Sequence, residues 1–247
     1  MTAARRPPAP RFTTDEAQRL ARLDTWVFDL DNTLYPRHSN LFAQIDVRIR
    51  DYVGRLLELD GEAADAMQKT YYRRYGTTLR GLMMEHDISP DDFLEYVHDI
   101  DHSPIAPNPR LAGAIAQLPG KRFIFTNGSR PHAEKVAARL GVTDHFEDIF
   151  DIVWADLMPK PARETYERFL AETGVSPASA AMFEDLSRNL AVPQALGMTT
   201  VLVVPGGTRP IFTEEWELEG HDADHIHYVT DDLTGFLDDV LAALSLV

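Results

Sequence analysis

The stretch that decides the fold is Val27-Phe28-Asp29-Leu30-Asp31-Asn32-Thr33-Leu34-Tyr35. It begins as an apolar strand and then presents two carboxylates, Asp29 and Asp31, two residues apart. Because side chains alternate along a strand, we expect both to project in the same direction from its C-terminal end. Their repulsion needs compensation, which a hard dication such as Mg²⁺ supplies because it prefers oxygen ligands. Taken alone, the stretch fits a strand that runs into a solvated Asp/Asn turn equally well.

Composition bounds the protein class. The chain has 247 residues, of which 44% are hydrophobic and 26% charged, which is typical of a globular protein with one large domain or a core plus a smaller module. A formal charge of −15 argues against nucleic-acid polymers as partners, because those need a basic face. With 0 cysteines, disulfides and thiolate catalysis are excluded. No apolar run is long enough to span a membrane, and we expect a cytoplasmic monomer or homodimer.

The first half of the chain predicts a short lead-in and a helical insert. Residues 1–12 carry arginines and prolines without the apolar stretch of a secretory signal, and we expect them to be disordered. After Tyr35, residues 36–108 read as a series of helices. The first of these helices has an apolar residue at every fourth position: Leu41, Ile45, Ile49, Val53 and Leu57. Ser89-Pro90 is a typical helix start.

The second half alternates strands with helices. Expected strands cover residues 121–126, 151–155, 180–183 and 200–204, and 226–229 is a candidate edge strand. This alternation predicts an α/β core of residues 13–35 and 109–247, with a Rossmann-like parallel sheet and helices on both faces. Residues 208–227 are acidic and irregular. Three histidines in that segment, His221, His225 and His227, lack the spacing of a metal site, and we expect them to lie at the surface.

Polar residues follow four of the predicted strands. They are Asp29 with Asp31, Thr126-Asn127-Gly128, Lys160 between two prolines, and Glu184-Asp185. Each has a simpler interpretation when considered separately: a turn, a surface lysine or acids at a helix N-terminus. The carboxyl ends of parallel strands meet at one edge of a sheet, so we expect the four groups to converge. Their occurrence together and in this order predicts an active site.

This ordered set resembles the four motifs of the haloacid dehalogenase superfamily, in particular its phosphatase branch. The matching residues are Phe28-Asp29-Leu30-Asp31-Asn32-Thr33, Thr126-Asn127-Gly128-Ser129, Lys160, and Phe183-Glu184-Asp185 followed by Asn189. The insert at 36–108 lies where this family places a cap domain. The stretches Asp31 to Tyr35, Tyr75-Gly76 and Glu184 to Asn189 further resemble the pyrimidine 5′-nucleotidase group. The resemblance implies a phosphatase for a small phosphomonoester, a pyrimidine 5′-mononucleotide above all.

The residues themselves suit this chemistry. Asp29 can attack phosphorus and form an aspartyl-phosphate. Asp31 can protonate the leaving alcohol and then activate water, and we expect the neighbouring carboxylate to raise its pKa in favour of the neutral acid. Thr126, Asn127 and Lys160 are the candidate phosphate-binding residues.

The resemblance also implies a metal site. Mg²⁺ would be held by the carboxylate of Asp29, the backbone carbonyl of Asp31, and Asp185. Glu184 would act through water. The dehalogenases of the superfamily lack an acid two residues after the nucleophile, so Asp31 favours phosphoester hydrolysis over carbon–halogen cleavage.

The insert is expected to select the substrate. Three tyrosines there, Tyr71, Tyr72 and Tyr75, are candidates to stack on a pyrimidine ring, and three arginines, Arg73, Arg74 and Arg80, to meet an anion. Packing within the insert is the alternative for each. Other functions stay open at this point: a phosphatase for phosphoglycolate, a sugar phosphate or pyridoxal phosphate, a phosphomutase, or a non-catalytic nucleotide-binding protein.

Overall fold

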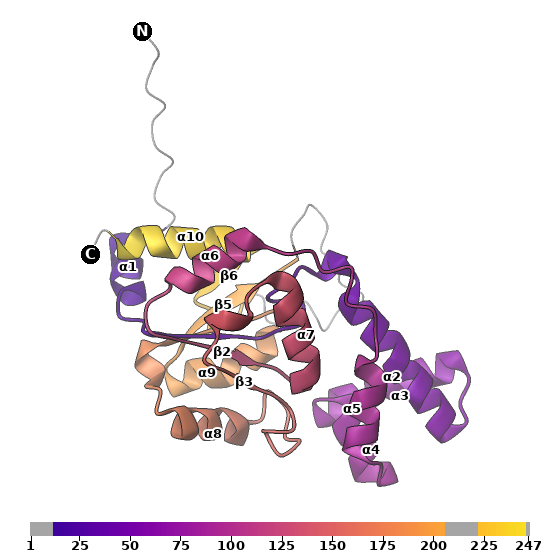
Figure 1. The fold of residues 1–247 in the computed structure, drawn as a ribbon. Helices are drawn as coiled ribbons and strands as arrows, with labels where there is room; N and C mark the ends of the chain where they lie inside the picture. Colours follow the sequence, from indigo (N-terminus) through magenta and orange to yellow (C-terminus); the bar gives the residue numbers. More distant parts are fainter. Residues whose placement is uncertain (1–11, 206–221, 246–247) are drawn as a thin grey trace.

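A six-stranded parallel sheet forms the centre of the molecule (Figure 1). The computed structural model describes residues 12–205 and 222–245. Strand order is β3-β2-β1-β4-β5-β6. The strands are β1 Thr25–Phe28, β2 Lys121–Phe125, β3 Asp148–Phe150, β4 Ala180–Glu184, β5 Thr199–Val203 and β6 Tyr228–Thr230. The predicted Rossmann-like α/β fold is confirmed, and the strand that precedes Asp29 lies between β2 and β4.

Helices cover both faces of the sheet, so its central strands are buried on both sides. In β1, Trp26 and Phe28 pack under one layer of helices, whereas Val27 points to the other. The first layer contains α1 Thr14–Leu20, α6 Pro109–Gln117, α7 Arg130–Leu140 and α10 Leu233–Leu244, and the second contains α8 Arg163–Thr173 and α9 Ala191–Leu196. This alternation of apolar residues is what a doubly covered parallel strand requires.

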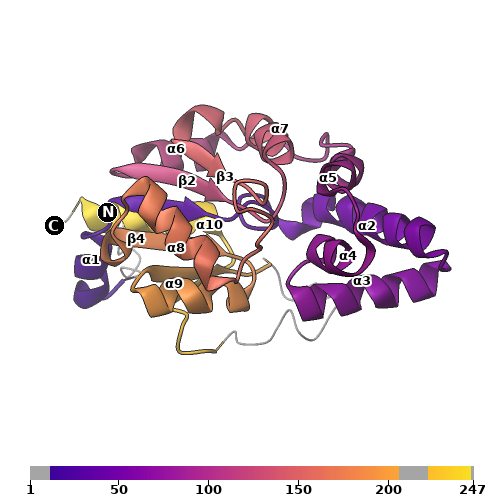
Figure 2. The same ribbon diagram turned by 90° about the horizontal axis from the view of Figure 1, so that it is seen from below.

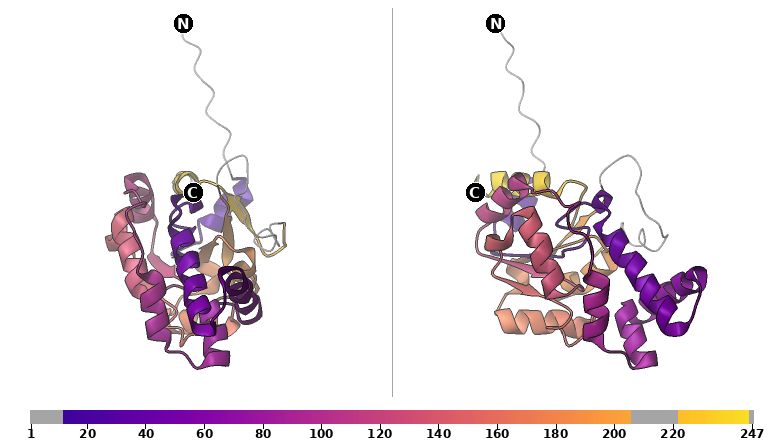
Figure 3. Two further views of the ribbon diagram at one scale, coloured as in Figure 1. Left: turned by 90° about the vertical axis from the view of Figure 1, so that its right-hand side faces the viewer. Right: turned by 45° about the vertical axis from the view of Figure 1, so that its right-hand side comes forward.

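Four helices between β1 and α6 form a separate body beside the sheet (Figures 2 and 3). They are α2 Leu41–Leu57, α3 Gly61–Tyr75, α4 Thr78–His86 and α5 Pro90–His98. The predicted apolar stripe of α2 is used: Ile45 and Val53 are buried in a hydrophobic cluster with residues of α3, α4 and α5. Ile152, from the loop after β3, joins this cluster and links the insert to the sheet. The insert therefore has its own core.

The prediction of a strand over residues 151–155 is wrong. The strand ends at Phe150, and the chain then turns. Asp151 is the reason: its carboxylate accepts hydrogen bonds from the backbone N–H groups of Arg130 (2.7 Å) and Trp154 (2.8 Å), which closes a turn at the end of the strand. The segment after β4 forms a 3₁₀ turn, Ser187–Leu190, which leads directly into α9.

Three smaller expectations concern the chain ends and the histidines. Phe12, the last residue of the expected disordered lead-in, is buried and packs edge-on against Tyr228 and Phe236. Residues 1–11 and His221 lie outside the described residues. His225 and His227 are partly exposed, and their side chains hydrogen-bond to Ser187 and Thr200. Across residues 12–205 and 222–245, no helix is both long and apolar enough to cross a bilayer.

Candidate active site

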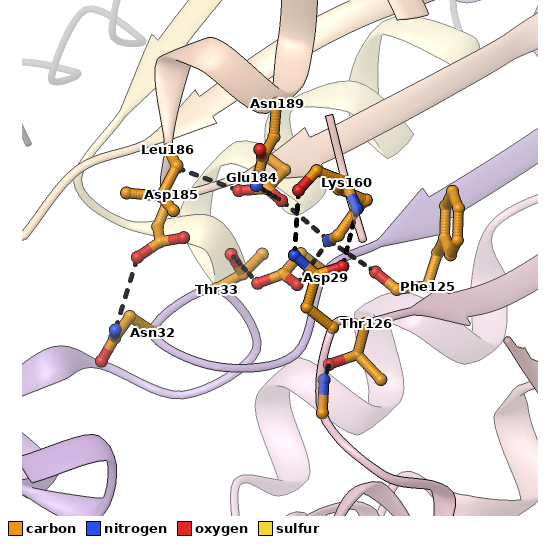
Figure 4. A network of polar contacts seen from close by, with 12 residues as sticks. Asp29, Asn32, Thr33, Phe125, Thr126, Lys160, Glu184, Asp185, Leu186 and Asn189 are labelled. Atoms are coloured by element: carbon orange, nitrogen blue, oxygen red, sulfur yellow. Dashed lines mark hydrogen bonds and ion pairs between the residues drawn. The ribbon is translucent and has the colours of Figure 1, made fainter. Parts of the chain in front are cut away.

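Polar side chains from three adjacent strands meet at the carboxyl edge of the sheet (Figure 4). Asp29 follows β1, Thr126 follows β2, Glu184 is the last residue of β4, and Asp185 follows it. These strands are neighbours in the sheet, so their ends are held side by side by the backbone ladder. Asp29 N–H continues that ladder by donating to the carbonyl of Phe183 at 2.9 Å. The sheet itself therefore sets the spacing of the site.

Lys160 is the centre of this cluster. Its ammonium is 1% exposed and donates to Asp29 Oδ1 (2.7 Å), Glu184 Oε1 (2.7 Å) and the carbonyl of Phe125 (2.8 Å). Three acceptors satisfy all three N–H groups of the ammonium. Burial works against the charge, but Asp29 and Glu184 hold the pKa of Lys160 above its ordinary value. The group is a permanent cation beside the carboxylate predicted to attack phosphorus.

The loop that carries Lys160 is fixed by Asn127. The Asn127 side chain accepts from the backbone N–H of Lys160 (2.8 Å) and donates to the carbonyl of Lys160 (3.2 Å). Prolines on both sides further restrict this backbone. The side-chain amide of Asn127, which sequence analysis assigned to phosphate binding, is thus engaged in holding Lys160 in place.

Asp29 lies in a polar but desolvated position. Its Oδ2 accepts a hydrogen bond from Thr33 Oγ1 at 3.1 Å, in addition to the Lys160 contact at Oδ1. Burial raises the pKa of Asp29 to about 7; Lys160 opposes this shift, and the charge of Glu184 adds to it. The carboxylate is therefore under-compensated when only the side chains of the protein surround it.

The donor set fits a divalent cation. Carboxylate oxygens of Asp29, Glu184 and Asp185 lie within 4.8 Å of one another. Among the described residues, Lys160 provides the one ammonium beside these three carboxylates. Burial, together with the charges of Glu184 and Asp29, raises the pKa of Asp185 well above its usual value. Beside them, Asn32 donates to Asp185 Oδ2 at 3.4 Å. Excess negative charge on clustered oxygen ligands is what Mg²⁺ sites provide.

Glu184 contributes to this set as a scaffold. Its Oε1 accepts from Lys160 and from Asn189 (2.7 Å), and its Oε2 accepts from the backbone N–H of Leu186 (2.9 Å). With its oxygens used in this way and 1% of the side chain exposed, it suits a supporting position behind Asp29 and Asp185.

Asp31 faces a different environment. Its Oδ1 accepts from the hydroxyl of Tyr35 at 2.5 Å and contacts Nε2 of His132 at 2.9 Å. Burial alone would raise the pKa of Asp31, but the attraction and hydrogen bond of His132 and the hydrogen bond of Tyr35 outweigh it, and the pKa lies below its ordinary value. The expectation of a raised pKa is therefore wrong, since these two partners outweigh the effect of burial.

The loop after β2 lines the space between the two aspartates. Thr126 is buried, and its Oγ1 accepts from the backbone N–H of Gly128 at 2.9 Å, which leaves its hydroxyl hydrogen to donate. A Cβ at Gly128 would lie 3.3 Å from Thr126 Oγ1 and 3.6 Å from Asp31 Oδ2. The absent side chain keeps the backbone close to both groups, and α7 begins two residues later. This arrangement suits an anion.

Sequence analysis missed a group of histidines behind Asp31. His132 lies in the first turn of α7, has 0% exposure, contacts Nε2 of His102 through Nδ1 at 3.2 Å, and stacks on His98 with ring centroids 4.6 Å apart. Nδ1 of His98 in turn contacts Oγ of Ser129 at 3.0 Å. In the sequence, each of these histidines lies in or near a helix and has no motif around it. They come together only in the folded structure.

The candidate substrate-selecting residues of the insert differ in what their side chains contact. Tyr71 is buried in the core of the insert, with its hydroxyl 2.6 Å from His86, so it cannot stack on a ligand. Tyr75 and Arg74 are both bound to Glu85. Tyr72 differs from them, because its ring lies under the guanidinium of Arg188, at 4.3 Å from the ring centroid. It is the one tyrosine of the three, among the described contacts, that reaches the sheet domain.

A family model for haloacid dehalogenase-like hydrolases matches residues 23–197. The chain belongs to this family. The match spans β1, the helical insert and β4, and so includes Asp29, Lys160 and Asp185. The chain is a hydrolase of this family by sequence as well as by fold.

Known relatives support the same placement. The chain is 26% identical over 193 residues to Phosphate metabolism protein 8 of Saccharomyces cerevisiae, a match that covers 71% of this chain and 60% of that protein. Among solved structures, it is similar to a HAD phosphatase from Thermococcus onnurineus (TM-score 0.57, 17% identity, 90% of this chain and 99% of that one). It is also similar to L-2-haloacid dehalogenase from Xanthobacter autotrophicus (TM-score 0.55, 16% identity, 87% and 97%). The structural similarity shows a fold that phosphatases and dehalogenases share.

Proposed function

We propose that this hydrolase is a Mg²⁺-dependent phosphatase for small phosphomonoesters, with pyrimidine 5′-mononucleotides as its substrate class. The observation that carries the proposal is the pair of aspartates at the end of β1. Asp29 has a buried ammonium at 2.7 Å, and Asp31 has two hydrogen-bonding partners on one of its oxygens. A dehalogenase needs only the first of these groups, whereas phosphoester hydrolysis also needs an acid for the leaving alcohol.

In the first half-reaction, a carboxylate oxygen of Asp29 attacks phosphorus, and the bond from phosphorus to the leaving oxygen breaks. The leaving oxygen takes a proton from Asp31. The resting pKa of Asp31 is low, but a phosphoryl dianion beside it disfavours the carboxylate form and shifts the pKa upward. Lys160 and the hydroxyl of Thr126 offset the charge that the phosphoryl oxygens bring.

In the second half-reaction, the Asp31 carboxylate removes a proton from water, and the oxygen of that water attacks phosphorus. The bond between Asp29 and phosphorus breaks, inorganic phosphate leaves, and both aspartates return to their starting forms. Asp29 and Asp185, with the backbone carbonyl of Asp31, would hold Mg²⁺. When bound, the ion supplies positive charge that stabilises the transferring phosphoryl group.

The pyrimidine preference rests on Tyr72 and Arg188. The aromatic ring belongs to α3 of the insert and the guanidinium to the turn after β4, so this pair bridges the insert and the sheet domain. A planar base can stack on either group. We further propose that the insert, residues 36–108, acts as a cap over the site.

Phosphate release from a panel of phosphomonoesters tests the proposal. We expect UMP and CMP to have a higher kcat/KM than glycerol phosphate, phosphoglycolate, sugar phosphates and pyridoxal phosphate. EDTA should abolish release, and added Mg²⁺ should restore it. Equal kcat/KM across the panel would contradict the nucleotidase assignment, and full activity in EDTA would contradict the metal requirement. Isomerised sugar phosphate without free phosphate would identify a phosphomutase instead.

A further inference from the structure

Three histidines connect Asp31 to the segment through which the chain leaves the insert. His98 is the last residue of α5, and His102 lies between α5 and α6, in the last part of the insert. Both contact His132 of the sheet domain, one by ring stacking and the other at 3.2 Å between ring nitrogens. His132 in turn contacts Asp31. The group is continuous from the last part of the insert to the end of β1, and nothing in the mechanism above uses it.

The contacts orient the carboxylate of Asp31. A carboxylate oxygen accepts hydrogen bonds, and Oδ1 of Asp31 lies 2.9 Å from Nε2 of His132, so we infer that Nε2 carries the hydrogen. Tyr35 donates to the same oxygen, Oδ1. Both hydrogen bonds described for this carboxylate thus end on Oδ1. Oδ2 is the oxygen on the side of Gly128, within the loop proposed to receive the phosphoryl group.

His132 is itself held from two sides. Its ring is fully buried, so it cannot turn into solvent. His98 covers one face of the ring, at an interplanar angle of 18°, and Nδ1 of His98 is anchored by the carbonyl of Leu94 (2.9 Å) and by Ser129. His102 is anchored by the carbonyl of Ile100 at 3.1 Å. A side chain locked by packing and by further hydrogen bonds is what accurate placement of a reacting group requires.

We propose that His132 is the positioning residue of Asp31, and that His98 and His102 tie this position to the C-terminal end of the insert. His132 does not touch the phosphoryl group. It holds Oδ1 of Asp31 so that Oδ2 presents the proton to the leaving oxygen and later receives one from water. The inference rests on the proposed function of Asp31 as the acid–base residue.

Single-turnover kinetics with two kinds of leaving group test the inference. UMP needs a proton on its leaving alkoxide, whereas p-nitrophenyl phosphate releases a stable phenolate without one. We expect His132→Phe to slow the release of uridine by about 10- to 100-fold and that of p-nitrophenolate by less than about threefold, since only the first needs general acid catalysis. His132→Gln keeps an N–H donor and should recover most of the loss. His38→Gln, at an exposed histidine of the insert, is the matched control.

A double variant separates positioning from a general loss of structure. If His132 acts through Asp31, Asp31→Asn combined with His132→Phe should be no slower than Asp31→Asn alone. We expect His102→Leu to give the same leaving-group pattern as His132→Phe with a smaller magnitude. Equal slowing of both substrates by His132→Phe, or additive losses in the double variant, would overturn the inference.

A crystal structure provides a readout that does not depend on turnover. In the His132→Phe variant we expect the Asp31 carboxylate to leave its position beside Tyr35, and in His132→Gln to keep it. An unmoved carboxylate in His132→Phe would overturn the positioning role even if the enzyme is a phosphatase. Wild-type protein that releases phosphate from no phosphomonoester would instead contradict the proposed function, so the two failures are distinguishable.

Discussion

Two aspartates, two residues apart, occupy opposite electrostatic environments. Asp29 has an ion partner, Lys160, and yet burial raises its pKa to about 7. Asp31 has no lysine or arginine among its described contacts, but His132 and Tyr35 bring its pKa below the ordinary value. Lys160 divides its charge between Asp29 and Glu184, whereas His132 and Tyr35 both act on a single oxygen of Asp31. Burial therefore dominates at Asp29, whereas at Asp31 the attraction and hydrogen bond of His132 and the hydrogen bond of Tyr35 outweigh it.

The difference matches what each residue is proposed to do. A nucleophile that shares its cation with another carboxylate keeps excess negative charge, which suits metal binding and attack on phosphorus. An acid–base residue needs a fixed orientation and a proton that comes and goes, which directed hydrogen bonds provide. Four changes can break or sharpen this contrast.

The largest expected effect is the loss of the nucleophile. Asp29→Asn keeps the shape of the side chain and one acceptor for Lys160, but an amide oxygen cannot form the phosphoenzyme. We expect turnover to fall by about 10⁴-fold or more, as for other enzyme nucleophiles, while the Kd for UMP measured by calorimetry stays within a few-fold. Undiminished hydrolysis by this variant would refute covalent catalysis by Asp29.

Removal of the shared cation should be next in size. Lys160→Met leaves Asp29 and Glu184 buried without an ammonium, and we expect the free energy of unfolding in urea to fall by about 3–5 kcal/mol. The double variant Lys160→Met/Glu184→Gln removes one of the stranded charges and should recover part of the loss. A double variant less stable than Lys160→Met would show that repulsion between the two carboxylates is not the cause.

The free energy of unfolding should depend on pH through His98, which stacks on His132. Burial, aided by the charge of His132, lowers the pKa of His98 from its ordinary 6.5 to about 4. Between these values the unfolded chain binds a proton that the folded chain does not, so this part of the stability is present above pH 6.5 and is lost as pH falls towards 4. The loss at pH 5 should be about 2 kcal/mol.

His98→Asn should remove this dependence. We expect the difference in unfolding free energy between wild type and His98→Asn to shrink by that amount between pH 7 and pH 5, measured by urea denaturation at each pH. His38→Asn, at an exposed position, controls for the general effect of removing a histidine. A difference that stays constant with pH would show that His98 is not kept neutral by its surroundings.

The smallest expected effect lies outside both carboxylate environments. Tyr72→Ala removes the ring under Arg188 and should raise KM for UMP by about tenfold, the value of one stacked aromatic contact, with kcat unchanged. Glycerol phosphate has no base to stack and is the control substrate. A change in kcat for both substrates would show that Tyr72 acts on the chemistry or on the insert's position rather than on base recognition.

Sequence alone predicts the part of the site that local pattern determines. Strand periodicity and the polar residues after each strand are sufficient to predict that Asp29, Thr126 and Asp185 lie together, because parallel strands end at one edge. The histidines could not be found in this way. His98 and His102 belong to the insert, and their contact with His132 depends on how the insert packs on the sheet, which no periodicity encodes.

Two of the sequence predictions are wrong because side-chain hydrogen bonds override what the sequence pattern indicates. The apolar run after Phe150 has strand composition, but Asp151 caps a turn with its carboxylate and ends the strand early. The pKa of Asp31 was expected to follow the nearest charge in sequence. The pKa is set instead by two hydrogen bonds to Oδ1 of Asp31, one from Tyr35 and one from His132. His132 lies 101 residues away along the chain.

The separate hydrophobic core of the four-helix insert makes it an exchangeable part. Its cluster is built almost wholly from α2 to α5, with Ile152 as a contact from the sheet domain. Grafting the corresponding segment of a related hydrolase between Tyr35 and Pro109 should therefore yield a chimera in which the donor dictates which molecules are accepted and the recipient supplies the reaction. Diversification of such enzymes can proceed by recombination of this one segment while the chemistry stays untouched.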